Sequence, residues 1–439
     1  GIMLPLMGLI MFPLITIFLG GNQTVGNLII IVAVGYVVVL PLILYFFVKR
    51  LISKRPGAYN QLSLDHVEDL PPKDKIVFNF RGSTYRAPLY ITSILVGLLI
   101  ALPGIIYYLE LFLTMGTIDT SISLGGGISQ ASDWESFIQN QYEISNLIPN
   151  VVQGITLIWG ITAGLIVYFY GRSYKRINLR RKIKDIEDKM ILTLTELQNE
   201  LSKNKPIENC FYAVVEKLDR SGLEEHSMRE FFKTTFDRMN ERNLPFHQAV
   251  FGDNILQNYP SPLLINTMEI IDSSVSKGPK AIESNVRNVR AYVENQEEVE
   301  RTISELLDEV VSQMKIQGKF IAPIITAAAG AMALVIVEVL FQISEALKGI
   351  EEALSVGGTS GATGSISDNI ALIQNLDSAL PPTVLILRTG LYLVEISVIL
   401  AYFTNGIENG FDEISKDVKI TKFLVFGITI YSVIVLITT

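Results

Sequence analysis

The sequence predicts an all-α polytopic membrane protein, with about seven transmembrane helices and a bundle of five or six helices on one side of the membrane. Three observations lead to this fold class. Hydrophobic residues make up 49% of the 439 residues, and the mean hydropathy is +0.37, which is too apolar for an ordinary soluble enzyme. Seven apolar segments have roughly the length, about 20 residues, at which a helix crosses a bilayer. Residues 171–319 are instead rich in charge and follow a helical period.

The seven expected spans lie along the whole chain. They are residues 2–19, 28–48, 89–109, 151–170, 320–343, 383–403 and 423–437. We therefore expect five regions, in the following order. They are a transmembrane hairpin at 1–48, a cytoplasmic linker at 49–88, a transmembrane pair with an acidic outer loop at 89–170, a cytoplasmic helical domain at 171–319, and a transmembrane region of three helices at 320–439.

The distribution of Lys and Arg among the loops predicts the orientation, because cytoplasmic loops near spans are enriched in both. The linker at 49–88 contains eight of them: Lys49, Arg50, Lys54, Arg55, Lys73, Lys75, Arg81 and Arg86. The loop at 110–150 has none, and the loop at 344–382 has only Lys348 among several acids. We therefore expect the linker, residues 171–319 and the loop at 404–422 to be cytoplasmic, with the two acidic loops outside.

Short helix-breaking segments, or breakers, divide residues 171–319 into several expected helices. The breakers are Asn204-Lys205-Pro206, Ser221-Gly222, Asn243-Leu244-Pro245, Tyr259-Pro260-Ser261-Pro262 and Lys277-Gly278-Pro279. Between them, apolar residues recur at helical spacing, as in the Met and Phe stripe from Met228 to Met239. We interpret this stripe, and the single cysteine Cys210, as parts of the bundle core. A long last helix is expected to run without a break into the span that begins at Phe320.

Composition excludes several classes of function. One cysteine permits no intrachain disulfide and no multi-cysteine metal site, and the three histidines fit no paired-ligand spacing. The sequence has no GxxxxGK[ST] motif, and its net charge of −8 argues against nucleic-acid binding. We therefore expect no cofactor, no metal and no enzymatic activity.

Several segments within residues 189–337 resemble one known family. They are MILTLTELQNELSKNKPIENCFYAVV at 190–215, PFHQAVFG, PSPLL and KGPKAI within 245–282, and GKFIAPIITAAAG at 318–330. Together with the order of spans, they resemble the type II secretion F-domain family, and within it the archaeal membrane platforms of type IV filaments such as the archaellum and pili. The sequence departs from many members at Asn204-Lys205-Pro206, where they have a glycine.

The resemblance implies a non-enzymatic platform in the cell membrane. Its partners would be a hexameric secretion ATPase docked on the cytoplasmic F domain at 171–319, pilin or archaellin subunits, membrane lipids and a second copy in a homodimer. Such platforms commonly carry two F domains, each followed by a membrane hairpin. Because residues 1–19 resemble the segment that follows the F domain, we expect a first cytoplasmic domain to precede Gly1 in the full protein.

A basic cluster opens the helical domain, and we consider it a candidate site. It consists of Arg172, Lys175, Arg176, Arg180, Arg181, Lys182 and Lys184. One interpretation is a topology signal in contact with anionic lipid headgroups, and the other is a docking surface for an acidic partner.

Three charged residues fall within the expected spans: Glu338, Arg388 and Glu395. Charges at membrane depth are costly, so they are usually paired or functional. Glu338 and Arg388 are expected at similar depth on antiparallel helices, where they would form a helix-pairing ion pair. For Glu395, a role lining a pilin-sized groove and a bond to a neighbouring helix both remain open.

Two other functions compete with the platform. A secondary transporter usually has broken spans and small cytoplasmic loops, whereas here the spans are mostly unbroken and the cytoplasmic insert is about a third of the chain. An intramembrane aspartyl peptidase needs two embedded acids that share a proton, and no Asp lies inside any expected span.

Overall fold

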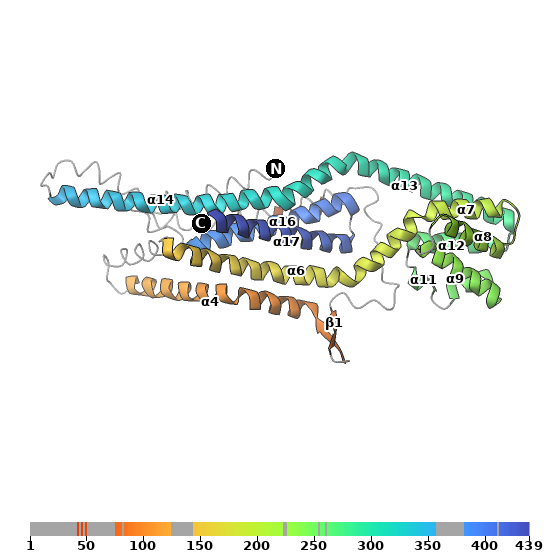
Figure 1. Cartoon of the computed structure of the whole chain (residues 1–439), viewed down its shortest axis with the longest axis horizontal. Helices are drawn as coiled ribbons and strands as arrows, with labels where there is room; N and C mark the ends of the chain where they lie inside the picture. Colours follow the sequence, from red (N-terminus) through yellow and green to blue (C-terminus); the bar gives the residue numbers. More distant parts are fainter. Residues whose placement is uncertain are drawn as a thin grey trace.

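The computed structural model describes residues 42–43, 45–46, 49–50, 75–80, 83–123, 144–222, 226–252, 255–259, 261–356, 382–410 and 412–438. Helices account for most of them, and they form an elongated molecule with two halves (Figure 1). One half contains the long apolar helices and the C-terminus, and we call it the apolar half. The other is a bundle of shorter helices, α7 to α12, packed against the first part of α13.

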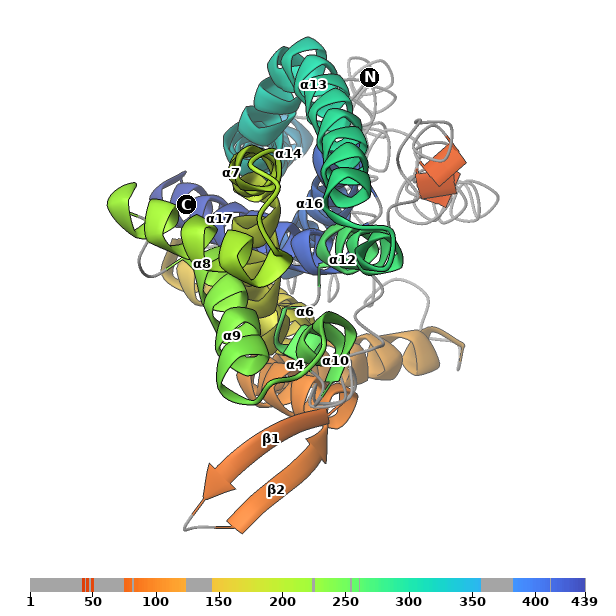
Figure 2. The ribbon, with the colours of Figure 1, turned by 90° about the vertical axis from the view of Figure 1, so that its right-hand side faces the viewer.

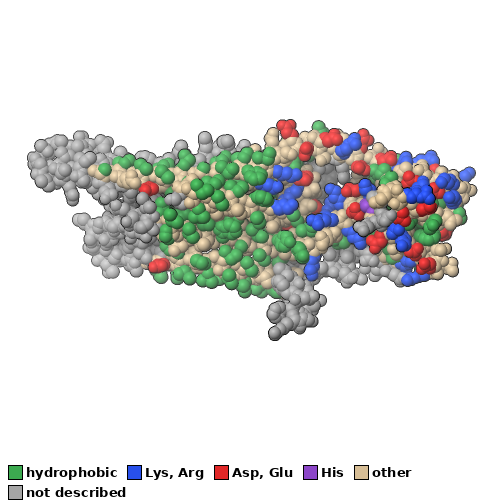
Figure 3. Space-filling model, viewed as in Figure 1, with side chains coloured by type: hydrophobic (Ala, Val, Ile, Leu, Met, Phe, Trp, Pro, Cys, Tyr) green, Lys and Arg blue, Asp and Glu red, His purple; other side chains and the backbone are tan. Residues whose placement is uncertain are grey.

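Among the described residues, five helices are long and apolar enough to cross a membrane, so the chain is a multi-pass membrane protein. The segments are Leu89–Glu110, Leu147–Asp188, Pro279–Ile336, Pro382–Asn409 and Glu413–Thr438. They contain the last five expected spans, apart from the outer end of the span at 320–343. The expected spans at 2–19 and 28–48 lie outside the described residues, except for short helical pieces between 42 and 50. Apolar side chains cover the apolar half in Figure 3, as a lipid-facing surface requires.

The apolar half contains α4 (Leu89–Ser123), α6 (Ile144–Asp188), α14 (Ala322–Val356), α16 (Pro382–Asn409) and α17 (Glu413–Thr438). Small residues bring α4 and α6 close together. A Cβ added to Gly160 would lie 2.4 Å from the Cβ of Ala101, and one added to Gly97 would lie 2.9 Å from the carbonyl oxygen of Gly160. Helices in lipid gain no hydrophobic free energy by associating, so such close backbone approach supplies the packing energy.

The bundle confirms the helices that the breakers predict. They are α7 (Met190–Leu201), α8 (Ile207–Arg220), α9 (Ser227–Glu241), α10 (Phe246–Phe251), α12 (Pro262–Val275) and α13 (Pro279–Ile316), with an additional short turn, α11 (Ile255–Asn258). Four of the breaks contain a residue with positive φ: Asn204 at 58°, Gly222 at 72°, Asn243 at 48° and Gly278 at 93°. Both residue types tolerate the left-handed conformation that ends a helix.

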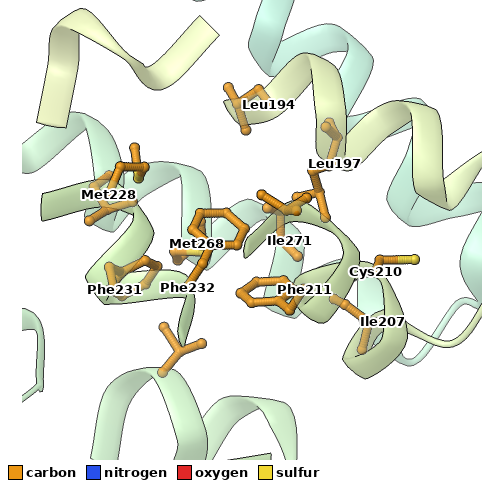
Figure 4. Packing of buried hydrophobic residues seen from close by; sticks show 14 of the residues in the cluster. Leu194, Leu197, Ile207, Cys210, Phe211, Met228, Phe231, Phe232, Met268 and Ile271 are labelled. Carbon is orange, nitrogen blue, oxygen red and sulfur yellow. The ribbon is translucent and has the colours of Figure 1, made fainter. Parts of the chain in front are cut away.

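Aromatic and aliphatic side chains from these helices form one core (Figure 4). Phe211 of α8 stacks on Phe232 of α9 with ring centroids 4.5 Å apart, and Met268 of α12 lies in the same cluster. Met228, at the start of the predicted stripe, and Cys210 are fully buried there. The interpretation of both as core residues is therefore confirmed.

Two continuous helical paths connect the halves. Helix α6 has 45 residues and spans about 67 Å at 1.5 Å per residue. Helix α13 continues through a single π-helical turn, η4 (Gln317–Ile321), into α14, and the axis bends there (Figure 1). The amide of Ala322 bonds to the carbonyl of Gln317, five residues earlier. This wider turn accommodates Pro323, which has no amide hydrogen to continue the α-helical pattern.

A two-stranded antiparallel sheet, which the sequence analysis does not predict, precedes α4. Strand β1 (Lys75–Phe80) pairs with β2 (Ser83–Pro88), with Lys75 opposite Pro88 and Phe80 opposite Ser83. Figure 2 shows this hairpin projecting to one side of the helices. It lies in the region expected to be the linker at 49–88.

Candidate functional site

The basic cluster lies on α6 where the helix leaves the apolar half, and the structure divides it into two sets. Positions 172, 176 and 180 recur every four residues, so they lie along one face of the helix. Arg172, Arg176 and Arg180 are half-buried on that face, whereas Lys175, Arg181 and Lys184 are exposed. Lys182 lies over the ring of Tyr259, with its Nζ 5.0 Å from the ring centroid. The two sets therefore have different roles.

Two members of the half-buried set, Arg172 and Arg180, form ion pairs with the beginning of α17. Arg172 Nη2 donates to Glu413 Oε2 at 3.0 Å, and its Nε lies 3.8 Å from Asp417 Oδ2. Arg180 Nε donates to Asp412 Oδ2 at 3.2 Å. Asp417 is 1% exposed, and Arg172 Nε and Lys416 Nζ lie 3.8 and 3.9 Å from its carboxylate oxygens. These pairs join two segments separated by more than 200 residues.

The turn that supplies these carboxylates is itself fixed by hydrogen bonds. Helix α16 ends before Gly410, whose φ of 64° is the conformation that glycine favours after a helix. Asn405 Nδ2 donates to the carbonyl oxygens of Gly410 and Asp412 at 3.3 and 3.1 Å. The Asp412 carboxylate accepts from the amide of Ile414 at 3.1 Å and from Ser415 Oγ at 2.7 Å, so it caps α17. We call this constellation the junction: Arg172 and Arg180 on α6, with Asp412, Glu413 and Asp417 at the start of α17.

A second charged constellation fixes the turn between α7 and α8. Glu200 is only 3% exposed, and its oxygens accept from Lys203 Nζ at 2.7 Å and from Lys205 Nζ at 3.1 Å, with Lys217 Nζ at 3.5 Å. Lys217 also bonds Glu196. The hydrogen bond from Lys203 is the main cause that lowers the pKa of Glu200 to about 2. Glu200 therefore remains ionised at neutral pH and holds the hairpin together.

The long helix α13 has an exposed apolar stripe that the sequence analysis does not single out. Tyr292, Val299 and Leu306 are 65%, 57% and 74% exposed, and Val310 is also exposed. The first three are spaced by seven residues, so they lie on one face of the helix, where Ile303 is half-buried. Between Tyr292 and Val310 the sequence has one base, Arg301, and seven acids: Glu294, Glu297, Glu298, Glu300, Glu305, Asp308 and Glu309. We call this surface the α13 stripe; its signal in the sequence is the heptad spacing.

The structure does not bring the intramembrane charges together. Glu338 lies on α14 and is bonded by Gln342 Nε2 at 3.5 Å, and no ion pair joins it to Arg388 of α16 in the part of the chain that the structure describes. The expected pair is therefore not present. Glu395 follows Arg388 on α16 by seven residues, and its Oε2 is buried without a hydrogen-bond partner among the described residues.

Residues that ligate metals are not grouped in the described ranges, where no three His, Cys, Asp or Glu side chains are placed to hold an ion. The constellations above are instead ion pairs, caps and an apolar surface. Such features position helices and bind partners, and none of them supplies a nucleophile beside a base.

The fold and these sites define a class: a multi-pass membrane protein whose membrane helices extend into a helical bundle. Comparisons with protein-family models, with curated proteins and with solved structures found no match.

Proposed function

We propose that this chain is a non-enzymatic platform in the cytoplasmic membrane that serves a type IV filament or secretion machine of archaeal type. A hexameric secretion ATPase docks on the bundle from the cytoplasm, and its motion is passed into the apolar half. The membrane helices then guide pilin or archaellin subunits out of the bilayer into a growing filament. In this proposal, residues 171–319 are the cytoplasmic F domain, and the platform acts as a homodimer.

The continuity of two helices between the halves is the observation that supports this proposal best. Helix α6 is a single helix from Ile144 to Asp188, and α13, η4 and α14 form a second continuous path from Pro279 to Val356. A flexible tether between two domains would dissipate a displacement, because a linker adopts many conformations. A continuous helix keeps its backbone hydrogen bonds and displaces both ends together.

The junction supports the same role. Helix α6 shares a buried apolar core with α16 and α17, to which it contributes Val151 and Ile158, and the junction adds a polar connection at the end of that core. The ion pairs of Arg172 and Arg180 connect α6 to the turn between those helices, at distances of 3.0 to 3.8 Å. A displacement of α6 is therefore transmitted to the two other spanning helices.

The α13 stripe is the docking face that we assign to the ATPase. An exposed apolar face of a soluble helix segment is a common mark of a protein–protein contact. Because this segment of α13 is acidic, an apolar partner surface with basic residues around it would suit the stripe, since opposite charges steer association. The exposed Lys175, Arg181 and Lys184 on α6 form the alternative docking surface, for an acidic partner.

The test uses the full chain in nanodiscs with a hexameric secretion ATPase from the same organism. Binding and the rate of ATP hydrolysis are measured for the wild type and for Leu306→Ser, which changes a side chain that is 74% exposed and contributes little to folding. Leu192→Ser is the matched control, because Leu192 is an exposed leucine of α7 outside the stripe. A triple change of Lys175, Arg181 and Lys184 to Gln tests the alternative surface.

We expect the wild type to bind and to change the ATPase rate, Leu306→Ser to weaken binding about tenfold, and Leu192→Ser to bind normally. The tenfold loss corresponds to about 1.4 kcal/mol, a typical value for a contact residue. Loss of binding only in the triple variant would move the docking face to α6. Absence of binding by the folded wild type would contradict the platform.

One observation favours a secondary transporter instead. Glu395 and Tyr392 lie on one face of the spanning helix α16, and Glu395 Oε2 and the Tyr392 hydroxyl are both buried without a hydrogen-bond partner among the described residues. Unpartnered polar groups in a span are typical of a transport path. Proton or solute uptake into proteoliposomes that Glu395→Gln abolishes would support this alternative.

A further inference from the structure

A lysine pocket lies where the bundle meets the apolar half, and neither the basic cluster nor the junction includes it. It encloses about 250 Å³ and is lined by Lys315, Lys319, Thr404, Glu408, Lys419, Lys422 and Phe423. Its walls come from the end of α13, from η4, from the end of α16 and from the start of α17. The pocket therefore exists only in the folded protein, because its lysines are about 100 residues apart in the sequence.

Four lysines against one glutamate give the lining of the pocket a net charge of +3. Glu408 Oε2 accepts from Lys419 Nζ at 2.7 Å and lies 3.0 Å from Lys315 Nζ, so it compensates part of the charge of these two lysines. Lys319 and Lys422 form no ion pair with any described carboxylate. Lys319 Nζ instead lies 5.9 and 5.8 Å from the ring centroids of Phe423 and Phe426. Two uncompensated ammonium groups thus face a cavity large enough for a small anion.

The position of the pocket relative to the apolar surface specifies the kind of anion. The chain becomes continuously apolar directly after Lys422 on α17 and directly after Lys319 on η4. Phe320 and Phe426 are half exposed beside the pocket, with ring centroids 6.4 Å apart. Lys and Arg side chains gather in Figure 3 where the apolar belt ends. A ligand that matches this site would combine a negatively charged headgroup with an adjacent apolar tail.

We propose that the lysine pocket binds the phosphate-bearing headgroup of an anionic membrane lipid, whose acyl chain lies against Phe320 and Phe426. Basic pockets between spanning helices on the cytoplasmic side are suited to such headgroups, since the lysines supply charge and the adjacent helices supply an apolar contact. The shared chemistry is a phosphate group, and the apolar wall selects the lipid over free phosphate. This inference does not depend on the proposed platform function.

The bound lipid would also connect the bent path of α13 and η4 to α17. Gly318 of η4 lies directly against the ring of Phe423, because a Cβ there would be 2.3 Å from Cε2 of that ring. A headgroup between Lys319 and Lys422 adds a second contact between the same two elements. The lipid therefore acts as a structural ligand at the bend.

The experiment measures binding of short-chain phosphatidylglycerol to the full chain in phosphatidylcholine nanodiscs by native mass spectrometry. The test variant combines Lys319→Gln and Lys422→Gln, which remove the two pocket lysines that form no ion pair with a described carboxylate. The control combines Lys277→Gln and Lys280→Gln, two exposed lysines in the turn before α13 and in its first turn, far from the pocket, so the net charge changes equally. Circular dichroism in phosphatidylcholine checks that both variants are folded.

We expect phosphatidylglycerol to bind the wild type and the control equally, and the test variant about thirty-fold more weakly. Each basic residue near a membrane surface contributes about 1 kcal/mol, so two correspond to about 2 kcal/mol, or about thirty-fold. Equal affinity in all three proteins would overturn the proposal. Inorganic phosphate is added as a competitor: displacement of the lipid at equal concentration would overturn the lipid assignment in favour of free phosphate.

Discussion

Replacing Glu200 by glutamine tests how the bundle is held together. The Glu200 carboxylate is 3% exposed and accepts from Lys203 at 2.7 Å and Lys205 at 3.1 Å. Glutamine keeps the shape of the side chain but loses the negative charge, and its amide NH₂ group then faces a lysine ammonium. The turn between α7 and α8 loses its charge compensation while the core around it is unchanged.

The pKa of Glu200 gives the size of the expected loss of stability. A pKa of about 2 in the folded protein, against a reference of 4.5, corresponds to about 3 kcal/mol of stabilisation of the ionised form. The lysine side chains are 38% to 54% exposed, so solvent screens part of this interaction. We therefore expect Glu200→Gln to lower the free energy of unfolding of the α7–α8 hairpin by about 2 kcal/mol.

Hydrogen exchange of the α7 and α8 amides in the full chain measures this change locally. A loss of about 2 kcal/mol lowers the protection factors about thirty-fold. Glu216→Gln is the matched control, because Glu216 pairs with Arg220 in a solvent-exposed helical pair expected to contribute about 0.3–0.5 kcal/mol. Equal protection in the two variants would refute the assignment of Glu200 as a stabilising centre.

The same carboxylate predicts an acid-sensitive component of stability. Since its folded pKa lies below the unfolded value, the stabilisation is fully present above pH 4.5 and is lost as the pH falls to about 2. After correction for the intrinsic exchange rate, the hairpin amides of the wild type should lose protection in this window. The Glu200→Gln variant should lack that component, and an unchanged pH dependence in it would contradict the prediction.

Two further changes test the apolar half and the junction. Gly160→Leu should force α4 away from α6, since even a Cβ added at Gly160 would lie 2.4 Å from the Cβ of Ala101. We expect the free energy of unfolding, measured by thermal unfolding, to fall by about 1–3 kcal/mol, and the control Leu99→Ala changes an exposed leucine of the same helix pair. Arg180→Gln and Asp412→Asn, combined in a double-mutant cycle, should show a coupling of about 1 kcal/mol, because asparagine keeps the cap of α17 but removes the charge. Zero coupling, measured by hydrogen exchange of the α16–α17 turn, would contradict the ion pair.

The helices of this fold could be predicted because their signals are local. Gly278 and Pro279 end one helix and begin the next whatever surrounds them, and Gly278 has the positive φ that this turn requires. The hairpin at Lys75–Pro88 also had a local signal, two short segments rich in β-branched and aromatic residues separated by Arg81-Gly82. The many basic residues around it favour a charged linker, and this signal outweighs the weaker strand pattern.

The sites could be predicted only in part, because their geometry depends on distant segments. The sequence indicates that Arg172 and Arg180 are basic residues at a membrane boundary, but their direction is set by Asp412 and Glu413, more than 200 residues later. Lys319 and Lys422 likewise form one pocket only after η4 packs on α17. Glu338 and Arg388 were expected to pair from their similar depth alone, and depth does not specify which faces of α14 and α16 meet.

The two paths into the membrane differ in a way that bears on how the proposed platform would work. Helix α6 keeps its α-helical pattern from Ile144 to Asp188, its axis curves toward the bundle (Figure 1), and the junction ties it to α17. The path through α13 bends at η4, where the amide of Ala322 bonds five residues back and Gly318 admits the ring of Phe423. π-helical turns in long helices are frequent at functional sites, because their wider hydrogen-bond pattern shifts the helix at lower cost than breaking it. In the proposed platform, a displacement of the bundle would therefore rotate α6, while the bend angle at η4 changes in the second path. A lipid in the lysine pocket would limit that movement, because it contacts η4 and α17 together.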